Sequence, residues 1–216
     1  YQALTAFTTG HTNVAIGYEV MKTATTVHDT IAIGYQALYS ATGDNNIAIG
    51  YQAGYSITSA RYNVLIGDQA GYSLTTSSEG NENVMIGNSA GRTADAATNA
   101  AHYNVYIGSD AGYYMDDGDS NVYIGRHAGK GSGTGNNATK NVIVGYESGR
   151  DITTGDSNVL LGYQAGDNAS TTSNNVAIGY QSLGAETGSL LTGGGTVAIG
   201  YQAFGVAEGG EGNGIA

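Results

Sequence analysis

The chain has 216 residues, with 36 glycines and no proline, cysteine or tryptophan. Its net charge of −11 opposes binding to nucleic acid or to an anionic membrane surface, because both are polyanions. Without cysteine the chain forms no disulfide and no cysteine-ligated zinc site, and its apolar runs are too short to span a membrane. We therefore expect no cofactor, no nucleic-acid partner and no direct membrane contact.

The chain opens at Tyr1-Gln2-Ala3-Leu4, the back half of a unit that then repeats along the whole sequence. Because it begins inside a repeat, we expect it to be a piece of a longer protein. Eleven copies align on a glycine: Gly17, Gly34, Gly50, Gly67, Gly87, Gly108, Gly125, Gly145, Gly162, Gly179 and Gly200. The spacings run from 16 to 21 residues, and 17 is the commonest. A fixed short period predicts a stacked array with one coil per repeat.

Each copy carries a short apolar segment directly before this repeat glycine. The residue three before it is Val or Ile in all eleven copies, and the residue just before it is Ile, Val or Leu. β-branched residues with period two predict a strand. The expected strands are residues 14–16, 31–33, 47–49, 64–66, 84–86, 105–107, 122–124, 142–144, 159–161, 176–178 and 197–199. The predicted fold class is all-β, a parallel β-solenoid or β-roll.

The middle residue of each segment is apolar or Tyr in every copy, and it is Ala near both ends of the chain. We expect the flanking Val and Ile to fill the coil interior, together with a small residue such as Ala53 from the following turn. A strand that is apolar on both faces needs a cover on both. We therefore predict that another chain covers the second face, through an inter-chain interface made by Leu65, Met85, Tyr106, Tyr123, Ile143 and Leu160.

Glycine and asparagine recur at fixed slots. The repeat glycine predicts a positive φ or a close backbone approach. A second glycine follows four residues later in seven copies: Gly54, Gly71, Gly91, Gly112, Gly129, Gly149 and Gly166. Asn directly precedes the strand in nine copies, and Thr30 and Thr196 replace it in two. Stacked Asn side chains about 4.8 Å apart favour an amide ladder, and the alternative is a row of ligands for a cation.

We expect residues 1–204 to form a single array of eleven coils, followed by a Gly-rich tail over residues 205–216. Three of the longest linkers between copies fall in the middle of the array. Insertions in a solenoid project from one side and often build a binding surface. We expect any ligand contact in the linkers Thr76–Asn81, Asp95–His102 and Lys130–Thr139, whose polar and acidic composition suits a carbohydrate or a protein surface.

No catalytic constellation or metal-ligand spacing stands out. The four histidines form no ligand-spaced pair, so we predict no catalytic residue and no metal site. Asp116, Asp117 and Asp119 could hold Ca²⁺, although solvated acidic turns are the favoured interpretation. The 17 tyrosines recur in fixed slots, which favours stacked ladders over exposed rows that bind sugar rings.

The unit Asn13-Val14-Ala15-Ile16-Gly17 resembles the Ser-Val-Ala-Ile-Gly signature of the head repeats in YadA-like trimeric autotransporter adhesins. The longer form in residues 46–54 and 175–183 looks like repeats of tail-fibre-type proteins of phages and of related bacterial surface proteins. The resemblance covers residues 1–204. It implies a left-handed parallel β-roll in which three chains wind about one axis.

These observations predict a non-enzymatic, extracellular segment of a homotrimeric cell-surface or virion fibre. Its expected partners are its own copies and a glycan or protein on a host or neighbouring surface. One alternative is a filament or spacer that binds no receptor. A polysaccharide-degrading spike is a less favoured alternative, because such an enzyme would need paired carboxylates in a cleft. An ice-binding solenoid would need rows of Thr-x-Thr where this chain has Val-x-Ile.

Overall fold

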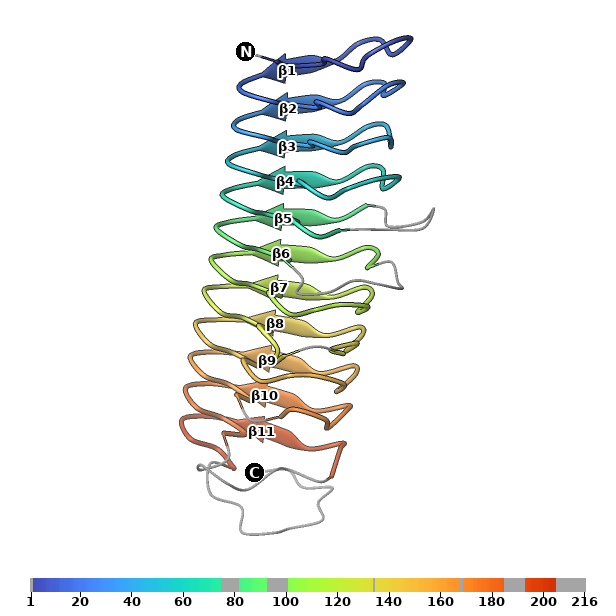
Figure 1. Ribbon diagram of the computed structural model, residues 1–216. Helices are drawn as coiled ribbons and strands as arrows, with labels where there is room; N and C mark the ends of the chain where they lie inside the picture. The colour runs from blue at the N-terminus through green and yellow to red at the C-terminus, as the bar shows by residue number, and fades with distance from the viewer. Residues whose placement is uncertain are drawn as a thin grey trace.

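The computed structural model describes residues 2–74, 82–92, 101–133, 135–167, 169–184 and 193–204. The chain winds into coils that stack as a rod, and each coil contributes one short strand to a single face (Figure 1). The strands are β1 (Val14–Ile16), β2 (Ile31–Ile33), β3 (Ile47–Ile49), β4 (Val64–Ile66), β5 (Val84–Ile86), β6 (Val105–Ile107), β7 (Val122–Ile124), β8 (Val142–Val144), β9 (Val159–Leu161), β10 (Val176–Ile178) and β11 (Val197–Ile199). The described residues contain no helix. The predicted parallel β-solenoid is confirmed.

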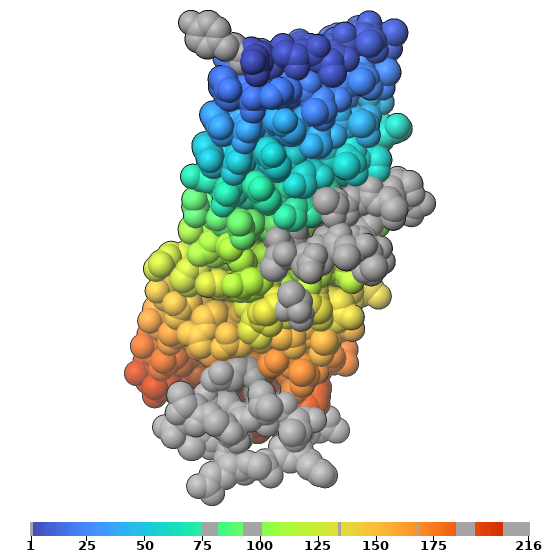
Figure 2. Space-filling view, in the orientation of Figure 1, coloured from blue at the N-terminus to red at the C-terminus, as the bar shows by residue number. Residues whose placement is uncertain are grey.

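The eleven strands form one parallel sheet in sequence order. Neighbouring strands pair slot for slot, so that Val14 lies beside Ile31 and Ala15 beside Ala32. The same in-register pairing holds along the whole sheet, including Met85 beside Tyr106. Every slot of the repeat therefore becomes a straight column along the rod, and the coils follow one another in colour order in the space-filling view (Figure 2).

The middle residue of each strand points into the coil interior. Leu65, Met85, Tyr106, Tyr123, Ile143 and Leu160 are all 0% exposed in the single chain. The prediction that these six residues form an inter-chain interface is therefore wrong, because no part of them reaches the surface. The flanking Val and Ile point outward instead, and Ile16 and Ile199 are 58% and 57% exposed. The prediction that they fill the interior is also wrong.

Two residues of each coil fill its interior from opposite sides: the middle strand residue and the residue four positions after the repeat glycine. In most coils one of the two is large where the other is small. Where the middle strand residue is bulky, the second glycine stands four residues after the repeat glycine. A Cβ on Gly112 would lie 2.7 Å from the ring of Tyr106, and one on Gly149 would lie 2.8 Å from Ile143. Where the middle residue is Ala15, Ala32, Ala177 or Ala198, the same later slot holds a large side chain.

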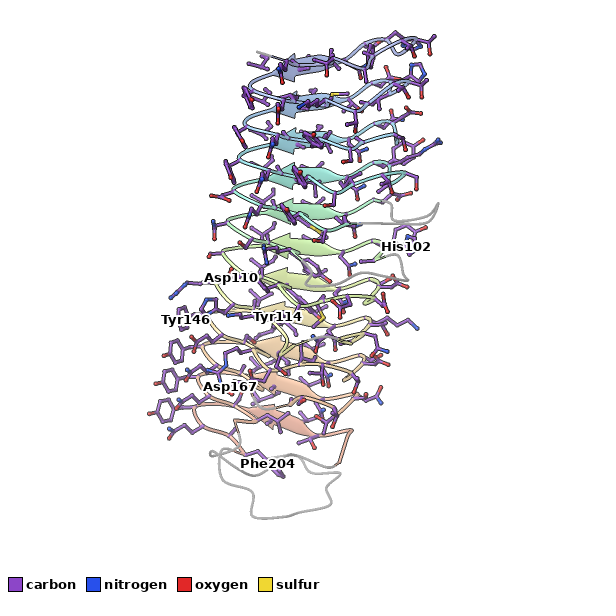
Figure 3. All side chains as sticks on the ribbon, viewed as in Figure 1. His102, Asp110, Tyr114, Tyr146, Asp167 and Phe204 are labelled. Carbon is purple, nitrogen blue, oxygen red and sulfur yellow. The ribbon has the colours of Figure 1, made fainter. Side chains whose placement is uncertain are left out.

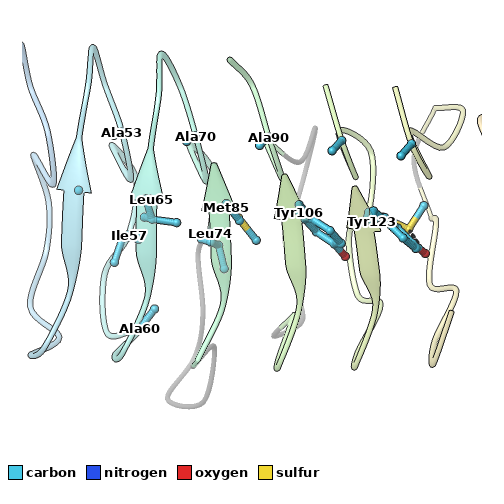
Figure 4. Packing of buried hydrophobic residues seen from close by; sticks show 14 of the residues in the cluster. Ala53, Ile57, Ala60, Leu65, Ala70, Leu74, Met85, Ala90, Tyr106 and Tyr123 are labelled. Atoms are coloured by element: carbon cyan, nitrogen blue, oxygen red, sulfur yellow. Dashed lines mark hydrogen bonds between the residues drawn. The ribbon is translucent and has the colours of Figure 1, made fainter. Parts of the chain in front are cut away.

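These large side chains are Met21, Leu38, Leu183 and Phe204, of which the first three are fully buried. In the third coil both slots are small, with Ala48 and Gly54, and Ile57 enters from the next turn. Figure 4 shows the buried side chains that fill successive coils, among them Ile57, Leu65, Met85, Tyr106 and Tyr123. Close packing of a narrow interior thus explains why the middle slot changes size along the chain.

Two tyrosines stack within the core. The rings of Tyr106 and Tyr123 have centroids 5.0 Å apart and lie within 18° of parallel. The Tyr123 hydroxyl contacts the Met115 sulfur at 3.8 Å. The Tyr106 hydroxyl makes no hydrogen bond within the described part of the chain. Burial raises the pKa of the Tyr106 hydroxyl well above its ordinary value, so the group is neutral.

Replacing Tyr106 by Phe should raise the free energy of unfolding by about 1 kcal/mol, because it removes a buried hydroxyl that lacks a hydrogen-bond partner. Chemical denaturation of both proteins measures the change. Tyr123→Phe is the matched control and should change stability less, since that hydroxyl has a weak sulfur acceptor. Destabilisation of the Tyr106 variant by more than the control would contradict this description of the core.

Ten of the eleven repeat glycines touch the next coil directly. Their φ angles lie between +129° and +141°, as does that of Gly200 at the end of the series. A Cβ on each glycine from Gly17 to Gly179 would collide with the backbone carbonyl of the repeat glycine in the next coil. The predicted positive φ and the predicted close approach therefore both occur at these positions.

The Asn column forms the predicted ladder inside the coil. The Asn63 side-chain oxygen accepts hydrogen bonds from the backbone N–H and the side-chain amide of Asn83, at 3.1 and 3.0 Å. The Asn83 amide also donates to the Ala101 carbonyl at 2.7 Å. The same pattern continues through Asn104, Asn121, Asn141, Asn158 and Asn175. These amides are buried, and a buried amide without a hydrogen-bond partner would destabilise the fold. The hydrogen bonds of the ladder provide those partners.

Candidate functional site

The outward face of the sheet is a continuous apolar strip. We call it the Val/Ile face, and it consists of the first and third residues of β1 to β11. All of its members are Val or Ile except Leu161, and none is polar or charged. Parallel strands normally have both faces covered. Within the described residues this face is not sealed, and Val14, Ile124 and Val142 are 41%, 36% and 38% exposed.

The Val/Ile face is large for one chain. Eleven strands spaced by about 4.8 Å give a strip roughly 50 Å long. With a width of about 10 Å for a three-residue strand and its side chains, its area is on the order of 500 Å². Apolar patches of this size on a protein surface usually mark an interaction site. The face is therefore the leading candidate for contact with another macromolecule.

A row of tyrosines runs along the edge of the Val/Ile face, directly after the repeat glycines. The rings of Tyr18, Tyr35 and Tyr51 stack with centroids 5.4 and 5.1 Å apart. Tyr146, Tyr163, Tyr180 and Tyr201 form a second stack with centroids 5.0 to 5.3 Å apart. These rings project outward from the rod, as Tyr146 does in Figure 3. Stacking covers the ring faces, so the edges and hydroxyls are what the row presents to solvent.

Beside the tyrosines runs a column of glutamines whose side-chain amides hydrogen-bond from coil to coil. Gln52 donates to Gln36 at 2.9 Å, and Gln181 donates to Gln164 at 2.9 Å. In the centre of the rod the column changes to Asp110, His127 and Glu147. The His127 ring lies between the two carboxylates, with nitrogen–oxygen distances of 3.2 and 3.5 Å.

The Glu147 carboxylate also accepts a hydrogen bond from Gln164 at 2.8 Å. This bond is the main cause that holds the pKa of Glu147 below its usual value. Glu19 occupies the same slot in the first coil of the column. Its carboxylate accepts hydrogen bonds from Lys22 and Gln36, which lower its pKa in the same way. Both carboxylates are therefore built into the column as anions.

The acidic turns serve mainly as connections between coils. Asp119 accepts a hydrogen bond from the His102 backbone N–H at 2.8 Å. Asp44 accepts one from the His28 N–H at 2.9 Å. Asp116 is only 6% exposed and binds the backbone N–H of Gly135, so it is not a solvated residue. Among the described residues, no group of three His, Asp or Glu side chains is arranged to hold a metal ion.

The predicted binding linkers are only partly visible. Thr76–Asn81 lies outside the described residues, as does Asp95–His102 up to residue 100. Lys130–Thr139 is described except for residue 134. Its Asn136 side chain is buried and donates to the Tyr114 and Gly133 carbonyls at 2.7 and 2.9 Å. This linker is therefore anchored to the coil before it.

No family model, curated protein or solved structure matches this chain. The function of the chain must therefore be inferred from its structure, above all from the Val/Ile face, the tyrosine row and the glutamine column. In the described part of the chain, no helix has the length and apolar character of a membrane span. Sequence reasoning found the tyrosine slots but not their direction. It recognised the Val and Ile residues as one face of each strand but assigned that face to the coil interior.

Proposed function

We propose that this chain is a segment of a homotrimeric extracellular fibre, of a cell surface or a virion, that attaches to a host or neighbouring surface. In this proposal three copies of a left-handed roll pack their Val/Ile faces around a common axis. The observation that carries the proposal is the uncharged apolar face along the whole sheet. An uncovered apolar strip of this length would promote nonspecific association, and a specific cover removes it from water.

Identical copies suit the Val/Ile face better than an unrelated partner. Two copies have the same spacing between coils, so side chains of one copy can fit between side chains of the other along the full length. The chain carries a net charge of −11, but none of that charge is on this face. Copies that meet through it keep their carboxylates apart, which limits repulsion.

Two columns on the face favour three copies over two. The first residues of the strands form one column, and the third residues form the other. In a threefold arrangement the first column of each chain meets the third column of the next. Each chain then contacts two neighbours, which increases the buried area beyond that of a single face-to-face pair.

Attachment would use the columns that lie outside the trimer core. The tyrosine, glutamine and charged turn residues offer phenol, amide and ionic groups at regular intervals. Groups of this kind on a rigid scaffold are suited to recognition. A spacer without a receptor is the alternative, in which the same trimer forms but its outer columns bind nothing.

Replacing Ile124 by Lys should convert the assembly to monomers. Ile124 lies on the Val/Ile face near the middle of the rod, and the threefold arrangement would bring three ammonium groups into one apolar layer. Burial of unpaired charge costs several kcal/mol. Sedimentation velocity measures the assembly state, and circular dichroism verifies that the coil remains folded.

Asn137→Lys is the matched control, since it adds the same charge at an exposed position in the same part of the chain. The control should sediment as the unmodified protein does. An Ile124→Lys protein that keeps the unmodified sedimentation coefficient would rule out assembly through the Val/Ile face.

A further inference from the structure

The Val/Ile face is bordered on each side by a column of residues that reach the surface. We call the residues two positions before each strand the upstream rim: Thr12, Asp29, Asn45, Tyr62, Glu82, Tyr103, Ser120, Lys140, Ser157, Asn174 and Gly195. We call the residues directly after the repeat glycines the downstream rim: Tyr18, Tyr35, Tyr51, Asp68, Asn88, Ser109, Arg126, Tyr146, Tyr163, Tyr180 and Tyr201. All of these residues are exposed or partly exposed. A molecule that covers the face therefore meets both rims.

The residues of the upstream rim share one backbone conformation. Their φ angles all lie between +53° and +78°. Because the backbone angles are equivalent and the coils stack in register, the side chains of this rim leave the rod in the same direction. Tyr62 and Tyr103 are 55% and 58% exposed. These two rings therefore extend into solvent from a column that is otherwise free of aromatic residues.

The two rims are complementary in size. Wherever the downstream rim holds a tyrosine, the upstream residue of the same coil is not aromatic. In the coils of β4 and β6 the arrangement is reversed, with Tyr62 and Tyr103 upstream and Asp68 and Ser109 downstream. Each coil therefore carries at most one rim tyrosine. Compensation of this kind is expected between side chains that share one space.

Within one chain the two rims do not share a space. The strand and its outward Val and Ile side chains lie between the two rim residues of each coil. Those residues are six positions apart in the sequence, and six extended residues span about 20 Å, which a tyrosine side chain cannot bridge. In the part of the chain that the structure describes, the stacked tyrosines of the downstream rim contact one another and not the upstream rim. The compensation therefore acts between two copies of the chain.

The threefold packing proposed above would bring the two rims together. The upstream rim borders the first column of the Val/Ile face, and the downstream rim borders the third. When the first column of one copy meets the third column of the next, the upstream rim of that copy meets the downstream rim of its neighbour. A ring of three closes only if every copy stands at the same level, so each coil faces its own counterpart. Tyr62 then lies against Asp68 of the neighbouring copy, and Tyr103 lies against Ser109.

The charged residues of the rims fit the same register. They are Asp29, Asp68, Glu82, Arg126 and Lys140. At equal level each of them faces an uncharged residue, and Lys140 faces the ring of Tyr146, which permits a cation–π contact. If each coil instead faced the preceding coil of its neighbour, Glu82 would meet Asp68, and Lys140 would meet Arg126. Both contacts would be repulsive. Ring closure, and not charge, excludes a slip in the opposite direction.

We propose that each copy recognises the next through these rims, with Tyr62 and Tyr103 of one copy packing into the places that Asp68 and Ser109 leave open on its neighbour. This inference rests on the assembly proposed above, and it adds the direction and the register of the contact and the residues that determine them. The partner is a second copy of this chain, parallel and at the same level. Because the rim of an interface stays partly in water, the outer edges of the tyrosine row remain accessible for attachment.

Cross-linking with a short bis-maleimide tests the pairing, because the chain has no cysteine of its own. A protein with Tyr103→Cys and Ser109→Cys should be linked mainly into covalent trimers, since each copy offers one thiol to each neighbour. Tyr103→Cys alone should give almost no covalent product, because upstream rims do not meet one another. The matched control combines Ser157→Cys with Ser109→Cys. Because those positions stand three coils and about 14 Å apart along the rod, the control should give roughly tenfold less covalent trimer on a denaturing gel.

Exchange of the two residues gives a second measurement that needs no reagent. Ser109→Tyr alone places two rings in one space, so the concentration at which half of the assembly dissociates should rise roughly tenfold. Adding Tyr103→Ser to the same protein should restore that concentration to within about threefold of the unmodified value.

Sedimentation of the untreated proteins separates the two proposals. Assembly that persists without cross-linking of the test pair would overturn this inference alone. Equal cross-linking of the control pair, or no recovery on exchange, would also overturn it and leave the proposed assembly intact. A chain that sediments only as a monomer would overturn both.

Discussion

Replacement of Gly108 by Ala should lower the free energy of unfolding by about 3 kcal/mol or more. Gly108 has a φ of +135°, which side-chain-bearing residues rarely adopt. An added Cβ would also collide with the backbone carbonyl of Gly125 in the next coil. The backbone carbonyl cannot move without breaking the coil-to-coil hydrogen bonds around it, such as that from the Gly125 N–H to Ile107 at 2.7 Å. Thermal or chemical denaturation measures the loss.

Gly133→Ala separates the strain of a positive φ from the collision with the next coil. Gly133 also has a positive φ, of +75°, but an added Cβ there would meet no atom within 4 Å. This control should therefore cost only about 1 kcal/mol, the strain of the backbone angle alone. Equal losses at Gly108 and Gly133 would show that contact between coils does not matter at the repeat glycine.

Leu38→Gly and Ala32→Leu should each destabilise the protein, and together they should largely cancel. Leu38 is fully buried and fills the part of the second coil that Ala32 leaves empty. Its removal should cost about 2 to 4 kcal/mol, after allowing for relief of its φ of +49°. Ala32→Leu alone should cost about 1 to 3 kcal/mol by overpacking.

The double variant reproduces the arrangement of Leu65 and Gly71 two coils later, where a Cβ on the glycine would lie 2.7 Å from the leucine. Its stability should lie within about 1 kcal/mol of the unmodified protein, which is a strong favourable coupling in a double-mutant cycle. Unfolding free energies of the four proteins give the coupling directly. Additive losses would show that the two slots do not share one space.

The repeat made the fold predictable, because a period that matches one strand and its turns leaves few arrangements. The eleven strands, their parallel order and the bends at glycine all followed from the Val-x-Ile-Gly unit and its spacing. The Asn ladder followed from the regular stacking of one polar slot. These features depend on local geometry that every copy repeats.

The direction of the strand faces was the main error, and two signals in the sequence could have corrected it. Asn63 and Leu65 are two residues apart, so they share a face, and a buried Asn ladder requires that face to be the interior. In addition, the size of the middle residue varies inversely with the size of the residue four positions after the repeat glycine. Such compensation is expected only between side chains that share one enclosed space.

The candidate surfaces were harder to predict because they depend on which columns point outward. The sequence shows Lys22, Tyr72 and Arg92 in equivalent slots, but only the coil geometry brings them into one line. Contacts such as that between Arg92 and Tyr113 depend on side-chain direction within a turn. Turn geometry of this kind involves αL residues such as Gln36, at a φ of +52°, which no strand pattern predicts.

Sedimentation equilibrium of the purified chain tests the central claim most directly. Packing of three Val/Ile faces predicts a single species with three times the mass of the 21.9 kDa chain. That mass should persist on dilution, because the apolar strip of every copy is buried in the assembly. A soluble species with the mass of one chain, stable across the same concentrations, would contradict the proposed fibre.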